Sequence, residues 1–179
     1  MPKFVSILLL LGLCMNVFAQ KEPPPPYLKT KRMPAFKVYQ VADSSVFTQK
    51  DLDKTKKTII IFYGPDCGHC MVFAKRLMDS VHLIQDAQVL MVTSFEFAKI
   101  QKFNDEFKMT DNPIITVGQD ENFFFITHFG IRHFPSAYVY SPTGRFLKKF
   151  ENDVYIADLL KVKVPARHAP STPRRRPRY

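Results

Sequence analysis

The motif Cys67-Gly-His-Cys70 restricts the possible folds most, because of the segments that surround it. Residues 58–63 before it are β-branched and aromatic, which is typical of a buried central strand. After it, apolar side chains recur every three or four residues and predict one face of a helix over residues 67–85: Phe73, Leu77, Val81 and Ile84. The sequence therefore predicts a turn from a buried strand into an amphipathic helix, with both cysteines at the helix start.

This position gives the two thiols different chemistry. Residues three apart at a helix start lie on the same side, close enough to form a disulfide. Cys67 lies where the backbone N–H groups are unpaired and the helix dipole is positive, which favours its thiolate, whereas Cys70 is shielded inside the first turn. We therefore assign Cys67 as the nucleophile and Cys70 as the resolving thiol that releases a mixed disulfide.

Between residues 35 and 163, short apolar runs alternate with segments of helical period, which predicts one α/β domain. With 46% hydrophobic residues, the 179-residue chain can bury one sizeable core, so wholesale disorder is excluded. The expected strands are 36–41, 58–63, 89–93 and 114–117, followed by a hairpin of 137–140 and 146–150. The expected helices after 67–85 are 95–107 and 153–160.

The segment Ile59-Ile-Ile-Phe-Tyr-Gly-Pro-Asp-Cys-Gly-His-Cys70 resembles the active-site strand and helix of the thioredoxin superfamily. Phe134-Pro135-Ser136 and the hairpin after it resemble the cis-proline and hairpin of that family. The long separation between Cys70 and Pro135, the N-terminal signal and the strand near Phe36 resemble its exported TlpA-like, peroxiredoxin-related branch. The resemblance implies a thioredoxin-like three-layer sandwich: a central mixed sheet flanked by helices, with an extra strand–helix insertion.

The same resemblance implies an exported thiol-disulfide oxidoreductase that exchanges disulfides with protein substrates and needs an upstream redox partner. It implies no cofactor and no metal. It also implies that the Phe134–Pro135 bond is cis and that these two residues bind extended substrate, because a cis proline opposite the cysteines leaves the preceding backbone free to pair. Residues 123–125, Phe129 and Phe134 could line an apolar groove for substrate, although most of them are expected in the core.

Several residues near the cysteines depart from the family pattern and are expected to tune the redox pair. Ile61 and Phe73 stand where relatives commonly carry an acid that handles protons. Asp66 replaces the usual aromatic residue; it could cap the helix, but its charge opposes ionisation of Cys67. His69 either stabilises the Cys67 thiolate as a cation or is an exposed, neutral residue with no role in the exchange. With Gly-His between the cysteines, we expect a reduction potential nearer the value of about −180 mV for disulfide isomerase than about −270 mV for thioredoxin.

Three other functions compete with this interpretation. Cys67 and Cys70 with a third soft ligand, Met71 or His133, would suit Cu(I) in a copper-handling protein. A non-catalytic peptide-binding module would not need both cysteines. A peroxidase is disfavoured because Cys67 lacks the Thr-x-x-Cys surroundings of peroxiredoxins.

The N-terminus predicts export. Lys3, the apolar run 4–13 and the segment 17–19 form the pattern of a signal peptide over residues 1–19, cleaved before Gln20. An uncleaved anchor and lipid attachment at Cys14 are the alternatives. Export places the chain in the periplasm or cell envelope, where disulfides form and persist.

Two proline-rich segments flank the expected domain at 35–163. Residues 20–34, with four consecutive prolines, are expected to form an extended linker. Residues 164–179 are expected to form a disordered basic tail that could contact anionic surfaces. Without the five arginines of this tail and Lys3, 20 basic residues face 16 acidic ones, so the net charge of +10 does not indicate a nucleic-acid partner. We expect a monomer.

Overall fold

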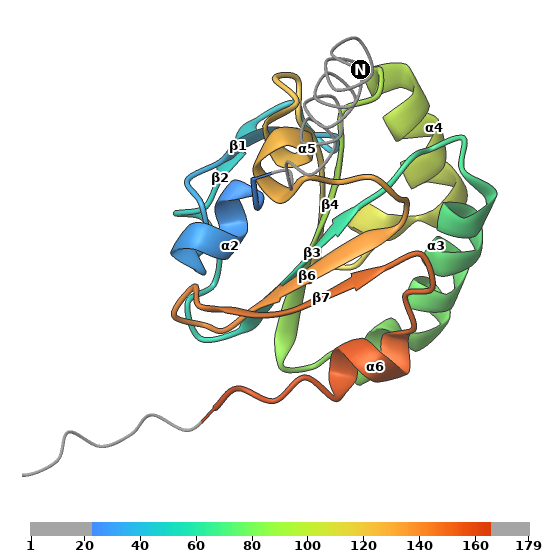
Figure 1. The fold of residues 1–179 in the computed structure, drawn as a ribbon. Helices are drawn as coiled ribbons and strands as arrows, with labels where there is room; N and C mark the ends of the chain where they lie inside the picture. Colours follow the sequence, from blue (N-terminus) through green and yellow to red (C-terminus); the bar gives the residue numbers. More distant parts are fainter. Residues whose placement is uncertain (1–22, 166–179) are drawn as a thin grey trace, which may run out of the picture.

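The computed structural model describes residues 23–165, and its centre is a mixed seven-stranded sheet (Figure 1). The strand order is β2-β1-β5-β4-β3-β6-β7. The strands are β1 (Lys37–Gln40), β2 (Val46–Thr48), β3 (Lys57–Phe62), β4 (Ala87–Thr93), β5 (Ile115–Gln119), β6 (Ser136–Tyr140) and β7 (Phe146–Glu151). Strands β3, β4 and β5 are parallel, and the outer neighbours pair antiparallel.

Helices cover both faces of the sheet, as expected for a three-layer sandwich. On one face lie α3 (Gly68–Ser80), α4 (Phe97–Phe107) and α6 (Ile156–Leu160), and on the other α2 (Pro26–Thr30) and α5 (Phe124–Phe129). Two 3-10 turns follow α3 and α4, at Val81–Leu83 and Met109–Asp111. No helix within residues 23–165 is long and apolar enough to cross a bilayer.

Strand β3 explains why the apolar run at its position is continuous. All six of its residues are buried, because the sheet has a core on each face. Ile59 and Ile61 belong to the core beneath α3 and α4, whereas Ile60 and Phe62 belong to the aromatic core beneath α2 and α5. This buried strand ends where the cysteine motif begins.

Part of the segment that we expected to be a linker belongs to the folded domain. Pro26–Thr30 forms α2, with a proline at its start, where a missing N–H costs nothing. Tyr27 is 4% exposed, and its ring lies 5.2–5.5 Å from the rings of Phe129, Tyr138 and Phe146. The extended-linker prediction is therefore wrong for this stretch, because burial of one aromatic ring offsets the ordering of a short helix.

The remaining elements follow the predictions closely, apart from two short ones that were not expected. β2 has three residues and α5 has six, too few to show a period. The predicted helix over 67–85 ends as an α-helix at Ser80. The proposed signal peptide, Cys14 and most of the basic tail lie outside the described residues.

Candidate active site

The cysteine motif lies where β3 leads into α3, as predicted. Cys67 is the N-cap of α3, with extended backbone angles, and its carbonyl accepts hydrogen bonds from the N–H groups of Cys70 (2.9 Å) and Met71 (3.1 Å). No side chain caps the helix, so the prediction that Asp66 could act as a cap is wrong. The unpaired N–H groups of the first turn therefore remain available near the Cys67 sulfur.

The two thiols differ in exposure as expected for a nucleophile and a resolving thiol. Cys67 is partly exposed, Cys70 is completely buried, and both are free, so the structure holds the dithiol form. The Gly64 N–H donates to the Cys70 sulfur at 3.5 Å. Burial raises the pKa of the Cys70 thiol far above its ordinary value, and a hydrogen bond with Cys67 raises it further. Cys70 is therefore held as a protonated thiol behind the exposed sulfur.

A distant segment completes the surroundings of Cys67. The Cys67 thiol donates to the carbonyl of Phe134 at a sulfur–oxygen distance of 3.8 Å. The Phe134–Pro135 bond is cis, which confirms that prediction. Pro135 is buried, whereas Phe134 is partly exposed, with its ring 5.5 Å from that of Phe62. The fold thus brings together the four residues predicted to react with or hold the substrate.

Asp66 has a partner that the sequence did not indicate. Lys99, on α4, forms an ion pair with it at 2.6 Å. Hydrogen bonding to Asp66 raises the pKa of Lys99, as expected for a cation beside a carboxylate. Asp66 therefore does not present an isolated negative charge to Cys67. His69 is exposed and has no hydrogen bond to any residue in 23–165, so neither interpretation of it gains support.

Gly64 sits at the tightest point of the site. A Cβ atom there would lie 3.3 Å from the Phe134 ring, 3.4 Å from the Cβ of Cys67 and 3.7 Å from the Phe95 ring. A side chain at this position would push against Cys67 and its neighbours. The sequence analysis missed Gly64, although a glycine directly after a buried strand is a signal of close approach.

The proposed aromatic groove is only partly present. Phe125 and Phe129 are fully buried in the core beneath α2 and α5, whereas Phe123 is 56% exposed. Phe123 and Phe134 therefore remain as candidates for contact with a substrate. Within residues 23–165 no three His, Cys, Asp or Glu side chains are grouped to hold a metal, so His133 does not complete a copper site with Cys67 and Cys70.

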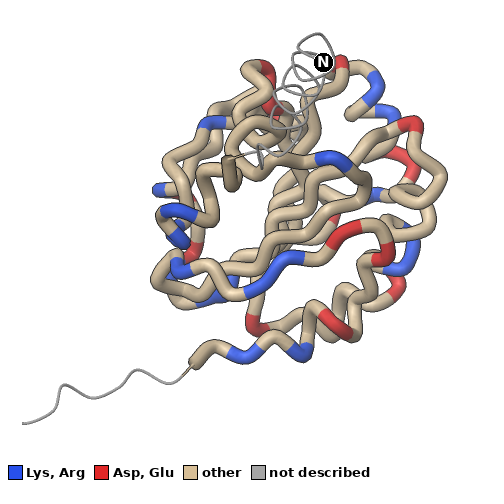
Figure 2. The backbone as a smooth tube through the Cα atoms, in the orientation of Figure 1, with Lys and Arg blue, Asp and Glu red and all other residues tan. Residues whose placement is uncertain are grey.

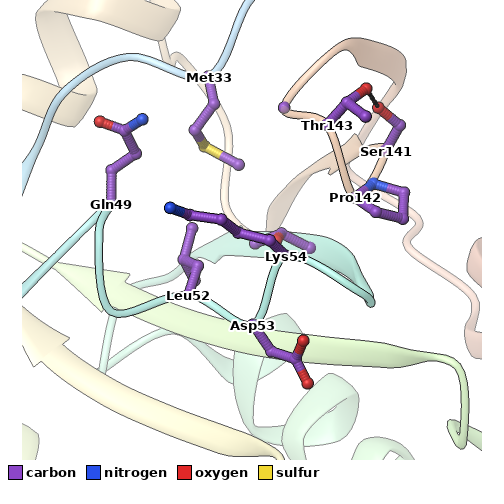
Figure 3. Close-up of a pocket in the computed structure, with 10 residues that line it drawn as sticks. Met33, Gln49, Leu52, Asp53, Lys54, Ser141, Pro142 and Thr143 are labelled. Atoms are coloured by element: carbon purple, nitrogen blue, oxygen red, sulfur yellow. Dashed lines mark hydrogen bonds between the residues drawn. The ribbon is translucent and has the colours of Figure 1, made fainter.

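A hollow of about 340 Å³ lies at the end of the sheet opposite the cysteines (Figure 3). It contacts Thr58, at the start of β3, whereas the cysteines follow the end of β3. Its wall includes the turn 141–144, where the Ser141 and Thr143 hydroxyls are hydrogen-bonded at 3.0 Å. Acidic and basic residues are interspersed along the described chain (Figure 2). No cysteine lines this hollow.

Comparison with known proteins adds evidence on the fold. No protein-family model and no curated protein matches the sequence. Among solved structures, a secreted Mycobacterium tuberculosis disulfide oxidoreductase homologous to E. coli DsbE is 15% identical, with a TM-score of 0.59 over 70% of this chain and 91% of that chain. Peroxidoxin BcpB from M. tuberculosis is 13% identical, with a TM-score of 0.62 over 72% of this chain and 90% of that chain.

A putative thiol:disulfide interchange protein DsbE from Chlorobium tepidum is 18% identical, with a TM-score of 0.57 over 71% of this chain and 86% of that chain. These proteins share the arrangement of sheet and helices with this chain at low identity. The likeness, with the strand order and the cis proline, shows that the chain has the thioredoxin fold.

Proposed function

We propose that this chain, which has the thioredoxin fold, is an exported thiol-disulfide oxidoreductase acting on proteins through Cys67 and Cys70. One observation carries the proposal: a partly exposed thiol at a helix start, 3.8 Å from the carbonyl that precedes a cis proline, with a second thiol buried behind it. An exposed nucleophile and a shielded resolving thiol are the two parts that disulfide exchange needs.

In the reductive direction, the Cys67 thiolate attacks one sulfur of a substrate disulfide. A bond forms between Cys67 and that sulfur, the substrate disulfide breaks, and the departing thiolate takes up a proton. Cys70 then loses its proton and attacks the Cys67 sulfur, which closes the Cys67–Cys70 disulfide and releases the second substrate thiol. The substrate gains two electrons and two protons, and a separate dithiol reductant must restore the protein.

The residues around Cys67 and Cys70 indicate how each cysteine would take part in the exchange. The carbonyl of Phe134 can accept a hydrogen bond from the Cys67 thiol before reaction and can pair with extended substrate backbone afterwards. Cys70 has an apolar environment, with Ile61 and Phe73 buried in the same core. Since no acid occupies either position, the departing substrate thiolate or water must take the Cys70 proton. We expect resolution of the mixed disulfide to speed up as pH rises.

The test uses the two single variants. Cys67→Ser should abolish exchange, whereas Cys70→Ser should complete the first half-reaction and accumulate a mixed disulfide with Cys67, visible by intact-mass spectrometry. Equal alkylation rates of both cysteines at pH 7 would contradict the assignment of roles. Trapping with Cys70→Ser in cells would also identify the physiological partners.

The redox direction and the export of the chain are parts of the same proposal. Equilibration with glutathione buffers should give a potential nearer about −180 mV than about −270 mV, and His69→Pro should lower it. A potential at or below the lower value would favour a dedicated reductase.

The mass of the mature protein should correspond to cleavage before Gln20. Protein purified without chelator should contain much less than one copper ion per chain. One copper ion per chain would favour the copper-handling alternative.

A further inference from the structure

An apolar pocket of about 390 Å³ lies next to Phe134, the residue that contacts Cys67. Its walls come from the end of β3, the loop between β4 and α4, the first turn of α4, the turn before α5, α5 itself and the residue before the cis proline. Five large apolar side chains line it: Phe62, Phe95, Phe123, Ile126 and Phe134. A pocket at the carboxyl ends of parallel strands is where α/β folds usually bind ligands.

The pocket and the reactive sulfur share neighbours. The Phe134 ring lines the pocket, whereas its carbonyl accepts the hydrogen bond from Cys67. Phe95, Phe134 and Cys67 all come within 3.7 Å of the Cβ position at Gly64. A substrate cysteine bonded to Cys67 would therefore place the residues next to it within reach of this pocket.

Phe123 is held on the pocket wall by an unusual backbone. Its φ angle is +54°, a left-handed conformation that aromatic residues rarely adopt. Asp120, which is buried, fixes the following helix by accepting the N–H groups of Phe124 (3.1 Å) and Phe125 (2.8 Å). With 56% of its surface exposed, Phe123 contributes little to the core, so the stability of the domain does not explain its position.

The charges at the pocket favour a neutral occupant. Lys99 contacts the pocket but is paired with Asp66 at 2.6 Å. Glu96, at the start of α4, is exposed and has no ion pair within the described residues, which leaves one negative charge at the rim. An acidic side chain would be repelled there, and a charged one would lose hydration against aromatic walls.

We propose that this pocket binds a large apolar side chain, of leucine or phenylalanine, carried by a residue next to or one removed from the substrate cysteine. The inference rests on the proposed function and narrows its substrates to extended segments in which a cysteine is flanked by such a residue. These segments are buried in folded proteins and accessible in unfolded ones.

The experiment measures mixed-disulfide formation by the Cys70→Ser protein. The substrates are disulfide-linked homodimers of short peptides in which Ala, Leu, Phe, Lys or Glu occupies each of the two positions on either side of the cysteine. Because each dimer is symmetric, attack on either sulfur gives the same product. Each rate is divided by the rate of the same variant with oxidised glutathione, which has no large apolar side chain.

At one position or more, Phe or Leu should react about tenfold faster than Ala, with Glu slowest. In the Phe123→Asn background this preference should fall below about twofold; asparagine tolerates the left-handed backbone, so the turn is retained. Phe123→Tyr keeps the ring and should keep the preference. Leu83→Asn, at a residue of similar exposure (55%) outside the pocket, is the matched control and should leave it unchanged.

Equal relative rates for Phe and Ala peptides would overturn the inference while leaving the proposed function intact. A preference that survives Phe123→Asn, or one for Lys or Glu, would overturn it as well. A concentration-dependent dimer that Phe123→Asn dissolves would assign the pocket to a second copy of the chain instead. If the trap protein does not react even with oxidised glutathione, the proposed function fails and the inference fails with it.

Discussion

The two ends of the central sheet are built in different ways. At the start of β3, polar side chains close their own turns: Asp51 accepts the Thr48 hydroxyl at 2.7 Å, and Asp53 accepts that of Thr55 at 2.6 Å. At the end of β3 lie a thiol with one long contact to a carbonyl and an exposed phenylalanine on a left-handed backbone. At the start of β3 the polar side chains form hydrogen bonds with one another, whereas the end of β3 presents groups that a substrate could contact. The difference teaches that a hollow alone does not mark a site, since both ends have one.

The largest expected effect is at the end that carries the cysteines. Gly64→Val adds three carbons where the first would already lie 3.3 Å from the Phe134 ring and 3.4 Å from Cys67. Overpacking of this kind costs about 1–3 kcal/mol and displaces the residues around the reactive sulfur. We expect exchange with oxidised glutathione to slow at least about tenfold. Stopped-flow kinetics beside thermal unfolding would check this; an unchanged rate would show that the close approach has no role in exchange.

The next effect concerns pH. The pKa of Cys70 is raised by burial, so the folded chain holds this proton more tightly than the unfolded chain does. As pH rises above about 8.5, the unfolded state loses the proton first, and the free energy of unfolding should fall by up to about 1.4 kcal/mol per pH unit. Urea unfolding of the reduced protein between pH 8 and 9 would measure the slope. This range lies below the pH at which Tyr63, Tyr138 and Tyr140, whose pKa values are also raised by burial, add a slope of the same sign. Cys70→Ser should remove it, and a slope that persists in this variant would trace it to another group.

Gly144, in the turn 141–144 near the start of β3, provides the comparison with Gly64 at the cysteine end. Gly144 has φ +74°, and a Cβ atom there would lie 3.2 Å from that of Met33. Gly144→Ala should lower the free energy of unfolding by about 1–2 kcal/mol, because alanine is strained in this conformation. The exchange rate should stay within twofold of wild type. A larger kinetic effect would mean that the two ends are coupled and that the contrast between them is wrong.

The smallest effect is expected in the same turn. Thr143 is exposed, and its hydroxyl is hydrogen-bonded to that of Ser141 at 3.0 Å. Thr143→Ala should therefore cost only about 0.5 kcal/mol in unfolding free energy and leave the exchange rate unchanged. Chemical denaturation and the glutathione assay measure the two quantities. A loss of exchange activity would indicate that the hollow in Figure 3 takes part in the reaction.

The sequence predicted those parts of the molecule that depend on neighbouring residues. The buried run of β3 and the apolar period of α3 are local patterns, so they placed Cys67 and Cys70 correctly at their junction. The family resemblance supplied the cis bond before Pro135.

The parts that the sequence did not predict depend on tertiary contacts. The Asp66–Lys99 ion pair joins the turn before α3 to α4, across 33 positions of the chain, and no local pattern couples the two residues. The burial of Tyr27 depends on a surface formed by α5, β6 and β7. The exposure of Phe123 could not be separated from the burial of Phe125, because α5 is too short to reveal which side faces inward.

The hydrogen bond from Cys67 to the carbonyl of Phe134 spans 67 positions of the chain. The contact depends on the pairing of β6 with β3, because β6 begins directly after Pro135. The burial that distinguishes Cys70 from Cys67 likewise depends on core residues from segments far apart in the sequence. The difference between the two thiols is therefore a property of the assembled sheet and helices and not of the four-residue motif alone.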